Sequence, residues 1–89
     1  MNKTYFLQID KVAIKALDNL LLKIYKQVTM KLFLLQKNSF PQDCKKLQGY
    51  ERGYRVDQGE YRILYMVEDD KIRVFKIGKR NDDEVYRNL

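Results

Sequence analysis

The spacing of hydrophobic residues changes once along the chain, near Gly49, and this change limits the possible folds more than any other feature. Before it, apolar residues recur at steps of three and four from Val12 to Leu35, as on amphipathic helices. After it, apolar and polar residues alternate in short runs, as in strands with one buried face. The sequence therefore predicts helices first and neighbouring strands afterwards.

The first half of the chain divides into a strand and two helices. Residues 4–9 have the β-branched and aromatic content of a short strand. Asp10 is a good N-cap for a helix of about two turns that ends near Asn19. A longer helix continues to about Lys37 and stops before Pro41.

The second half contains three predicted strands, at residues 53–57, 60–67 and 71–77. Gly59 suits the positive φ of a tight hairpin, and the connections are too short for crossovers, so the strands form an antiparallel meander. The predicted class is α+β, with a short N-terminal strand, two helices and the three-stranded meander, and with the helices packed on one face of a small twisted sheet. Residues 1–89 contain no repeat or linker and are expected to form a single domain.

Composition excludes several kinds of chemistry. With no histidine and a single cysteine, the chain lacks Ser/His/Asp and Cys/His arrangements, and it has no glycine-rich phosphate loop. Its acidic clusters, at residues 69–70 and 82–84, fall in predicted turns, so we expect solvated charges rather than a metal site, and no cofactor. A net charge of +6 commonly serves solubility, but in a domain this small it also favours a polyanionic partner, with nucleic acid as the first candidate.

Arginines and a tyrosine near the ends of the predicted strands are the remaining candidates for a site: Arg55, Arg62, Arg80 and Tyr86. If the sheet brings the arginines together, their planar donors suit phosphate oxygens. RNA supplies its own nucleophile, the 2′-hydroxyl, so alignment and charge stabilisation would provide most of the rate. The alternative for Arg62 is that its stem simply covers the edge of the core.

Five short segments resemble the RelE/ParE toxins of bacterial toxin–antitoxin pairs: Lys46-Leu47-Gln48-Gly49, Tyr54-Arg55-Val56, Gly59-Glu60-Tyr61-Arg62-Ile63-Leu64-Tyr65, Ile77-Gly78-Lys79-Arg80 and Glu84-Val85-Tyr86. Their order and spacing cover nearly the whole chain. The resemblance implies the RelE-like microbial ribonuclease-type fold. It also implies a ribosome-dependent endoribonuclease that cuts mRNA in the A site of the 70S ribosome without a metal.

The resemblance assigns roles to the candidate residues. Arg62 and Arg80 would contact the scissile phosphate, and Arg80 would also protonate the leaving oxygen. Tyr86 would stack on a base or help to take the proton from the 2′-hydroxyl, while Arg55 would support the transition state. Lys79 falls where other members often have histidine.

Further cations are expected to contact RNA: Lys46, Arg73, Lys76 and Lys79. Lys71, Arg73 and Lys76 are expected to meet ribosomal RNA nonspecifically, and a solvated strand edge is an equal alternative for these three residues. Asp57 departs from the family pattern, because ribonuclease members have a lysine there and an acid would repel phosphate.

The resemblance also implies a partner, a small and partly acidic antitoxin encoded beside the toxin. We expect it to contact Met30, Phe33 and Leu34, which widen the apolar arc of the long helix, unless that helix is buried on two sides. Operator DNA would be bound only through the toxin–antitoxin complex.

Two other functions remain open. The same fold includes ParE-like inhibitors of DNA gyrase, and a catalytically silent member could act as a co-repressor with its antitoxin. We expect no membrane partner and a cytoplasmic location, because the N-terminus lacks a signal peptide and Lys23 and Lys26 interrupt the leucine-rich stretch.

Overall fold

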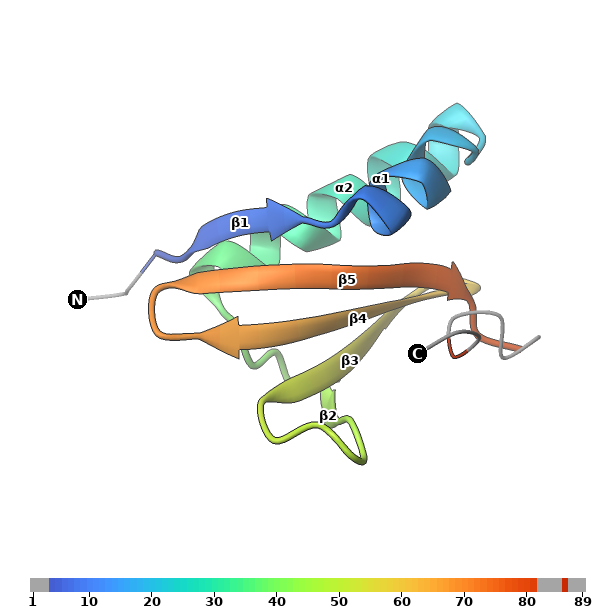
Figure 1. The fold of residues 1–89 in the computed structure, drawn as a ribbon. Coiled ribbons are helices and arrows are strands. Elements are labelled where there is room, and N and C mark those ends of the chain that lie inside the picture. Colours follow the sequence, from blue (N-terminus) through green and yellow to red (C-terminus); the bar gives the residue numbers. More distant parts are fainter. Residues whose placement is uncertain (1–3, 82–85, 87–89) are drawn as a thin grey trace.

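The computed structural model describes residues 4–81 and residue 86, which form two helices packed on one face of a five-stranded sheet (Figure 1). The elements in chain order are β1 (Phe6–Ile9), α1 (Lys11–Asp18), α2 (Leu22–Lys37), β2 (Lys45–Lys46), β3 (Gly53–Gln58), β4 (Tyr61–Glu68) and β5 (Lys71–Lys79). The predicted α+β class, the two helices and the antiparallel meander are confirmed.

The sheet is mixed and has the order β1-β5-β4-β3-β2. β1 lies parallel to β5 at one edge, while the remaining pairs are antiparallel. β2 was not predicted, because two residues are too few to show an alternating pattern; its Lys45 lies opposite Arg55. The β3–β4 turn was predicted one residue too early, since Gln58 pairs with Tyr61 and the turn residues are Gly59 and Glu60. Gly59 has the expected positive φ of 60°.

The helix boundaries agree with the sequence, with one difference at the start of α1. Asp10 occupies the N-cap position with an extended backbone, and its carbonyl accepts the N–H groups of Ala13 and Ile14. Its carboxylate makes no capping hydrogen bond, however, and instead binds Arg73 on β5. The predicted side-chain cap is therefore replaced by a link between the helix start and the sheet.

The main core lies between the helices and the sheet. Its members from α1 and α2 are Ala13, Leu17, Val28, Leu32 and Leu35, and its buried members from the strands are Val56, Ile63, Tyr65, Ile72, Val74 and Ile77. Each large aliphatic side chain buried there contributes about 1.5–3 kcal/mol. The Tyr65 hydroxyl donates a hydrogen bond of 2.8 Å to the carbonyl oxygen of Ser39, which ties the centre of β4 to the segment after α2.

An irregularity between β4 and β5 adapts the sheet to this core. Leu64 pairs with Lys76, whereas the next residue, Tyr65, pairs with Val74. The extra residue on β5 is Phe75, so Val74 and Ile77 both reach the helix-covered core although two residues separate them. Strict alternation would have put Ile77 on the opposite face from Val74.

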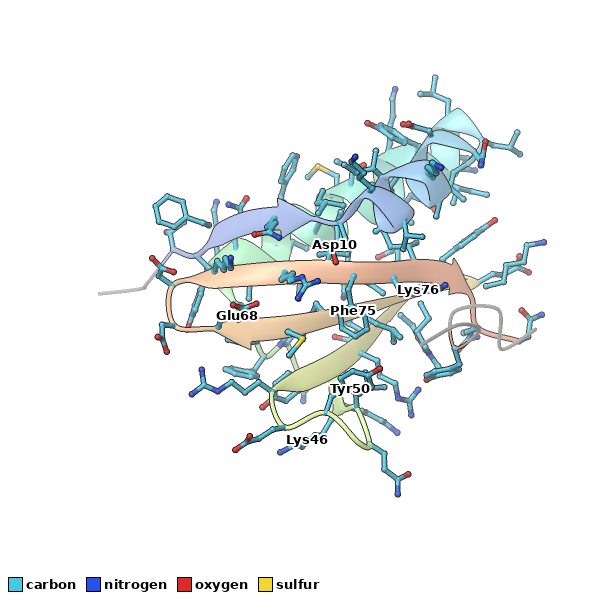
Figure 2. The ribbon with its side chains drawn as sticks, viewed as in Figure 1. Asp10, Lys46, Tyr50, Glu68, Phe75 and Lys76 are labelled. Atoms are coloured by element: carbon cyan, nitrogen blue, oxygen red, sulfur yellow. The ribbon has the colours of Figure 1, made fainter. Side chains whose placement is uncertain are left out.

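A smaller apolar cluster covers part of the other face of the sheet. Leu64 is fully buried there with Leu47, and Tyr50, Phe75 and Tyr86 pack against them. Figure 2 shows Tyr50 and Phe75 on the face turned away from the helices. The loop after β2 therefore folds over this open face and forms one wall of the site described next.

Candidate functional site

The open face of the sheet, opposite the helices, carries the charged side chains of β3 and β4. Val56 packs into the helix-side core, so its neighbours Arg55 and Asp57 point to the open face. In the antiparallel register, Asp57 lies directly opposite Arg62 on β4. Arg62 thus stands on the open face beside an acidic neighbour.

Arg62 is held by two partners. Its Nε and Nη2 donate to the two carboxylate oxygens of Asp57 at 2.7 and 3.2 Å, and its Nη1 donates to the Tyr86 hydroxyl at 3.1 Å. The Arg62 side chain is only 16% exposed, so this arginine is largely enclosed. The hydrogen bond to Asp57 is the main reason why the pKa of Arg62 is raised above its ordinary value.

Arg80 reaches the same carboxylate from the end of β5. Its backbone N–H donates to the Glu60 carbonyl at 3.0 Å, which holds it beside the β3–β4 turn. Its Nη1 lies 3.3 Å from Oδ2 of Asp57, and the side chain remains half exposed. The hydrogen bond from Arg62, with a smaller contribution from Arg80, lowers the pKa of Asp57 below its ordinary value. Asp57 is therefore the shared counter-ion of the two arginines.

Four of the residues predicted for the site line one open pocket of about 410 Å³: Lys46, Arg55, Arg62 and Tyr86. The loop after β2 supplies the other lining residues: Leu47, Gln48 and Tyr50. Arg80 is not among them. It lines an adjacent pocket of about 250 Å³ with Asp43, Lys45, Arg55, Val56, Asp57 and Arg62. Arg55 and Arg62 border both pockets, so the two hollows form one basic region, here called the arginine site.

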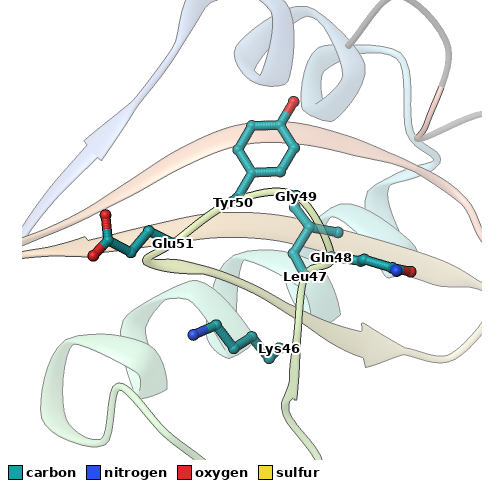
Figure 3. A pocket seen from close by; sticks show the side chains of 6 residues that line it. All are labelled: Lys46, Leu47, Gln48, Gly49, Tyr50 and Glu51. Carbon is teal, nitrogen blue, oxygen red and sulfur yellow. The ribbon is translucent and has the colours of Figure 1, made fainter.

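A third hollow, of about 470 Å³, lies on the loop itself and is lined by residues 46–51 (Figure 3). Its charged residues are one lysine and one glutamate, Lys46 and Glu51. The balance of charge there does not favour an anion, in contrast to the arginine site.

The other predicted RNA contacts are not among the residues that line the arginine site. Arg73 forms a bidentate pair with Asp10, with Nε and Nη2 at 3.1 and 2.8 Å from the carboxylate oxygens. Lys76 stands at the β5 irregularity. Lys79 is exposed, and it borders a hollow with residues of the helices, such as Ala16 and Leu20. These cations do not converge with Arg62 on one pocket.

The predicted antitoxin contacts lie on the outer side of α2. Met30, Phe33 and Leu34 are 59%, 50% and 57% exposed, whereas Leu32 and Leu35 are buried. The alternative prediction, that α2 is buried on two sides within the chain, is therefore wrong. The apolar arc is available for a partner.

Sequence reasoning missed three parts of the site. It treated Asp57 as an obstacle to phosphate, not as the partner of Arg62 and Arg80. It also did not assign Lys45, or the wall formed by Leu47 and Tyr50. The resemblance in the segment 46–49 was the available indication for this wall.

The arrangement offers donors and positive charge to an anion. Arginine and tyrosine have ordinary pKa values above 12 and of about 10, so neither is suited to accept a proton at neutral pH. Within residues 4–81 and at 86, no three His, Cys, Asp or Glu side chains are grouped so that they could hold a metal ion. In the same part of the chain, neither helix is long and apolar enough to cross a bilayer.

Structures of known proteins share this fold. The archaeal RelE–RelB complex from Pyrococcus horikoshii OT3 matches with a TM-score of 0.77 and 31% identity, over 86% of this chain and 96% of that chain. The isolated Escherichia coli RelE toxin matches with a TM-score of 0.75 and 30% identity, over 92% and 90%. The fold and its site thus define a small basic domain of the RelE type.

The sequence comparisons give the family. The family described as the ParE toxin of the type II toxin–antitoxin system parDE matches residues 7–84. The mRNA interferase toxin RelE of Escherichia coli K12 is 33% identical over 87 residues, which is 92% of this chain and 90% of that protein. The chain belongs to the RelE/ParE superfamily of toxins of type II toxin–antitoxin systems.

Proposed function

We propose that this toxin is a ribosome-dependent endoribonuclease that cleaves mRNA in the ribosomal A site. One observation carries the proposal: Lys46, Arg55, Arg62 and Tyr86 converge on one pocket of the open sheet face, with Arg80 beside them. The similarity to the mRNA interferase toxin RelE of Escherichia coli supports it. The product would be a cleaved messenger, and the effect would be the arrest of its translation.

The proposed reaction uses RNA, solvent water and the side chains of the arginine site. The 2′-oxygen attacks the adjacent phosphorus and the bond from phosphorus to the 5′-oxygen breaks, which leaves a 2′,3′-cyclic phosphate and a 5′-hydroxyl. Arg62 and Arg80 stabilise the added negative charge on the phosphate, and Arg80 donates the proton to the leaving oxygen. Tyr86 stacks on a base or relays the proton of the 2′-hydroxyl to solvent water, and Arg55 supports the transition state. Water then returns a proton to Arg80.

Other cations would hold RNA outside the reacting bond. Lys46 would meet a neighbouring phosphate of the messenger, which its position in the same pocket as Arg62 supports. Lys76, Lys79 and Arg73 would face ribosomal RNA without reading sequence. The ion pair between Arg73 and Asp10 makes Arg73 the weakest of these contacts.

The partner of this toxin would be an antitoxin that is partly acidic and encoded in the adjacent gene. The related structures from Pyrococcus horikoshii and Escherichia coli are complexes of RelE with RelB, which supports a complex of this kind. The exposed arc of Met30, Phe33 and Leu34 fits one amphipathic helix. We expect the toxin to act in the cytoplasm and to reach operator DNA only within that complex.

A second candidate is inhibition of DNA gyrase, which the match to the ParE toxin family favours. A silent toxin that acts with its antitoxin as a co-repressor is a third candidate, favoured by the partial neutralisation of the arginines by Asp57.

Primer extension on a defined messenger, free and bound to programmed ribosomes, tests the proposal. The expected result is cuts at the A-site codon that require both ribosomes and the toxin. If no cuts appear and the toxin inhibits supercoiling by purified gyrase, the proposed ribonuclease function is wrong and gyrase inhibition is the function. The absence of both activities would favour the co-repressor.

A further inference from the structure

Within the arginine site, the Asp57 carboxylate binds the Arg62 guanidinium and so defines its orientation. An arginine has five N–H groups, of which one is on Nε and two are on each terminal nitrogen. Asp57 accepts from Nε and from Nη2, and the Tyr86 hydroxyl accepts from Nη1. One hydrogen therefore remains on each terminal nitrogen of Arg62 for an incoming anion.

We propose that Asp57 is a positioning residue, whose carboxylate fixes Arg62 and Arg80 for the phosphate of the RNA. This inference rests on the proposed function, because it assigns a supporting role within the same site. Asp57 binds the Nε–H and one Nη2–H of Arg62, which leaves one hydrogen on each terminal nitrogen for the substrate.

Two further observations support this role. Oδ2 of Asp57 lies within hydrogen-bond distance of both arginines, at 3.2 Å from Arg62 Nη2 and 3.3 Å from Arg80 Nη1. A shared anion offsets the repulsion between two neighbouring cations, so both can stand beside one pocket. The Asp57 side chain is only 32% exposed, so water competes less with this pair than with the open pair of Arg52 and Asp69.

The positioning role and its alternatives predict different effects of Asp57→Asn. If the carboxylate orients the arginines, its loss removes negative charge from an RNA-binding surface but leaves Arg62 less well aligned. RNA then binds as tightly as before or more tightly, while the bound RNA is cut more slowly, by roughly 10- to 100-fold. If Asp57 merely competes with phosphate, both binding and cutting improve. If it only stabilises the fold, both become weaker.

Single-turnover cleavage on programmed ribosomes, with the dissociation constant of the toxin measured in parallel, separates these cases. Asp69→Asn is the matched control, because it makes the same change in an exposed pair outside the site and should match the wild type. Asp57→Glu should recover part of the lost rate, because it restores the carboxylate. A rate for Asp57→Asn equal to or above that of the wild type would overturn the proposal, as would parallel losses of affinity and rate.

A second readout does not depend on catalysis. The Nε–H of Arg62 should give a slowly exchanging NMR signal in the wild type and in Asp69→Ala, and this protection should be lost in Asp57→Ala, which has no side-chain acceptor. Retained protection in Asp57→Ala would overturn the inference. If the wild type cuts no RNA, the proposed function fails, but this signal still decides whether Asp57 fixes Arg62.

Discussion

Asp57 and Arg62 face each other across β3 and β4, with Oδ1 of the carboxylate 2.7 Å from Nε of the guanidinium. The acidic residue that departs from the family pattern is thus bound to the arginine expected to contact phosphate. Asp57, which was expected to repel phosphate, is therefore part of the site. The pair should also make the stability of the fold depend on pH.

The Asp57 pair should contribute to stability in a pH-dependent way. The hydrogen bond from Arg62 lowers the pKa of Asp57 in the folded protein. A lowered pKa means that the carboxylate stabilises the fold above the unfolded-state pKa of about 3.9, and that this contribution is lost as the pH falls through the lower folded-state value. We therefore expect the stability advantage of the wild type over Asp57→Asn to be constant from about pH 7 to about pH 5 and to decrease below about pH 4.

Urea unfolding of both proteins across this range measures the difference. Asp69→Asn, taken through the same series, corrects for the change in net charge. The same pH dependence in the two variants would show that the Arg62 pair adds nothing.

Replacing Arg80 by alanine should abolish cleavage without unfolding the protein. Its side chain is half exposed, so the free energy of unfolding should change by about 0.5 kcal/mol or less. The rate should fall by about 100-fold or more, because a charge-stabilising donor is lost. Cleavage and antitoxin binding are measured together, with Arg52→Ala as the control at an exposed arginine outside the site. Loss of folding in Arg80→Ala would mean that this arginine is structural.

The buried hydroxyl of Tyr65 should matter for stability and not for activity. Tyr65 is fully buried, and its burial raises the pKa of the hydroxyl, which therefore remains a donor throughout the neutral range. Tyr65→Phe leaves the Ser39 carbonyl without this donor, which should cost about 1–3 kcal/mol in denaturant unfolding. Tyr25→Phe, at a tyrosine that is 37% exposed, should change stability little. Equal stabilities of the two variants would contradict the importance of this link.

A charge on the outer face of α2 should prevent antitoxin binding. Phe33 is half exposed between Met30 and Leu34, so Phe33→Glu should leave the fold intact. A central aromatic contact is worth about 2 kcal/mol or more, so the affinity for the antitoxin from the adjacent gene should fall at least about 30-fold. Leu21→Glu places the same charge at an exposed leucine before α2 and is the control. Calorimetry with purified antitoxin measures the affinity of both variants. Unchanged affinity in Phe33→Glu would mean that the antitoxin binds another surface of the toxin.

The elements with long, regular patterns could be predicted from the sequence. The apolar spacing of α2 and the alternation of β4 were enough to give their type and approximate ends. β2 could not be predicted, because two residues have no period. The irregularity at Phe75 also could not be read from the pattern, because it depends on how Val74 and Ile77 meet the helices.

The site was harder to predict than the fold, because it depends on register. A turn placed at Gln58 and Gly59 brings Arg62 opposite Arg55, whereas the observed turn at Gly59 and Glu60 brings it opposite Asp57. An error of one residue in the predicted position of the turn was therefore enough to miss the pair of Asp57 and Arg62. The resemblance pointed to arginines that the structure brings together, but it could not show how a residue that departs from the family pattern would be used.

Cleavage of a messenger with a single 2′-deoxynucleotide at the mapped cut position tests the central claim most directly. In the proposed reaction, the arginine site aligns the 2′-hydroxyl of RNA and stabilises the charge that forms on phosphorus. On programmed ribosomes, the unmodified messenger should yield an upstream fragment with a 2′,3′-cyclic phosphate, and the 2′-deoxy messenger should stay intact at that position. Cutting of both messengers at the same rate would contradict the account.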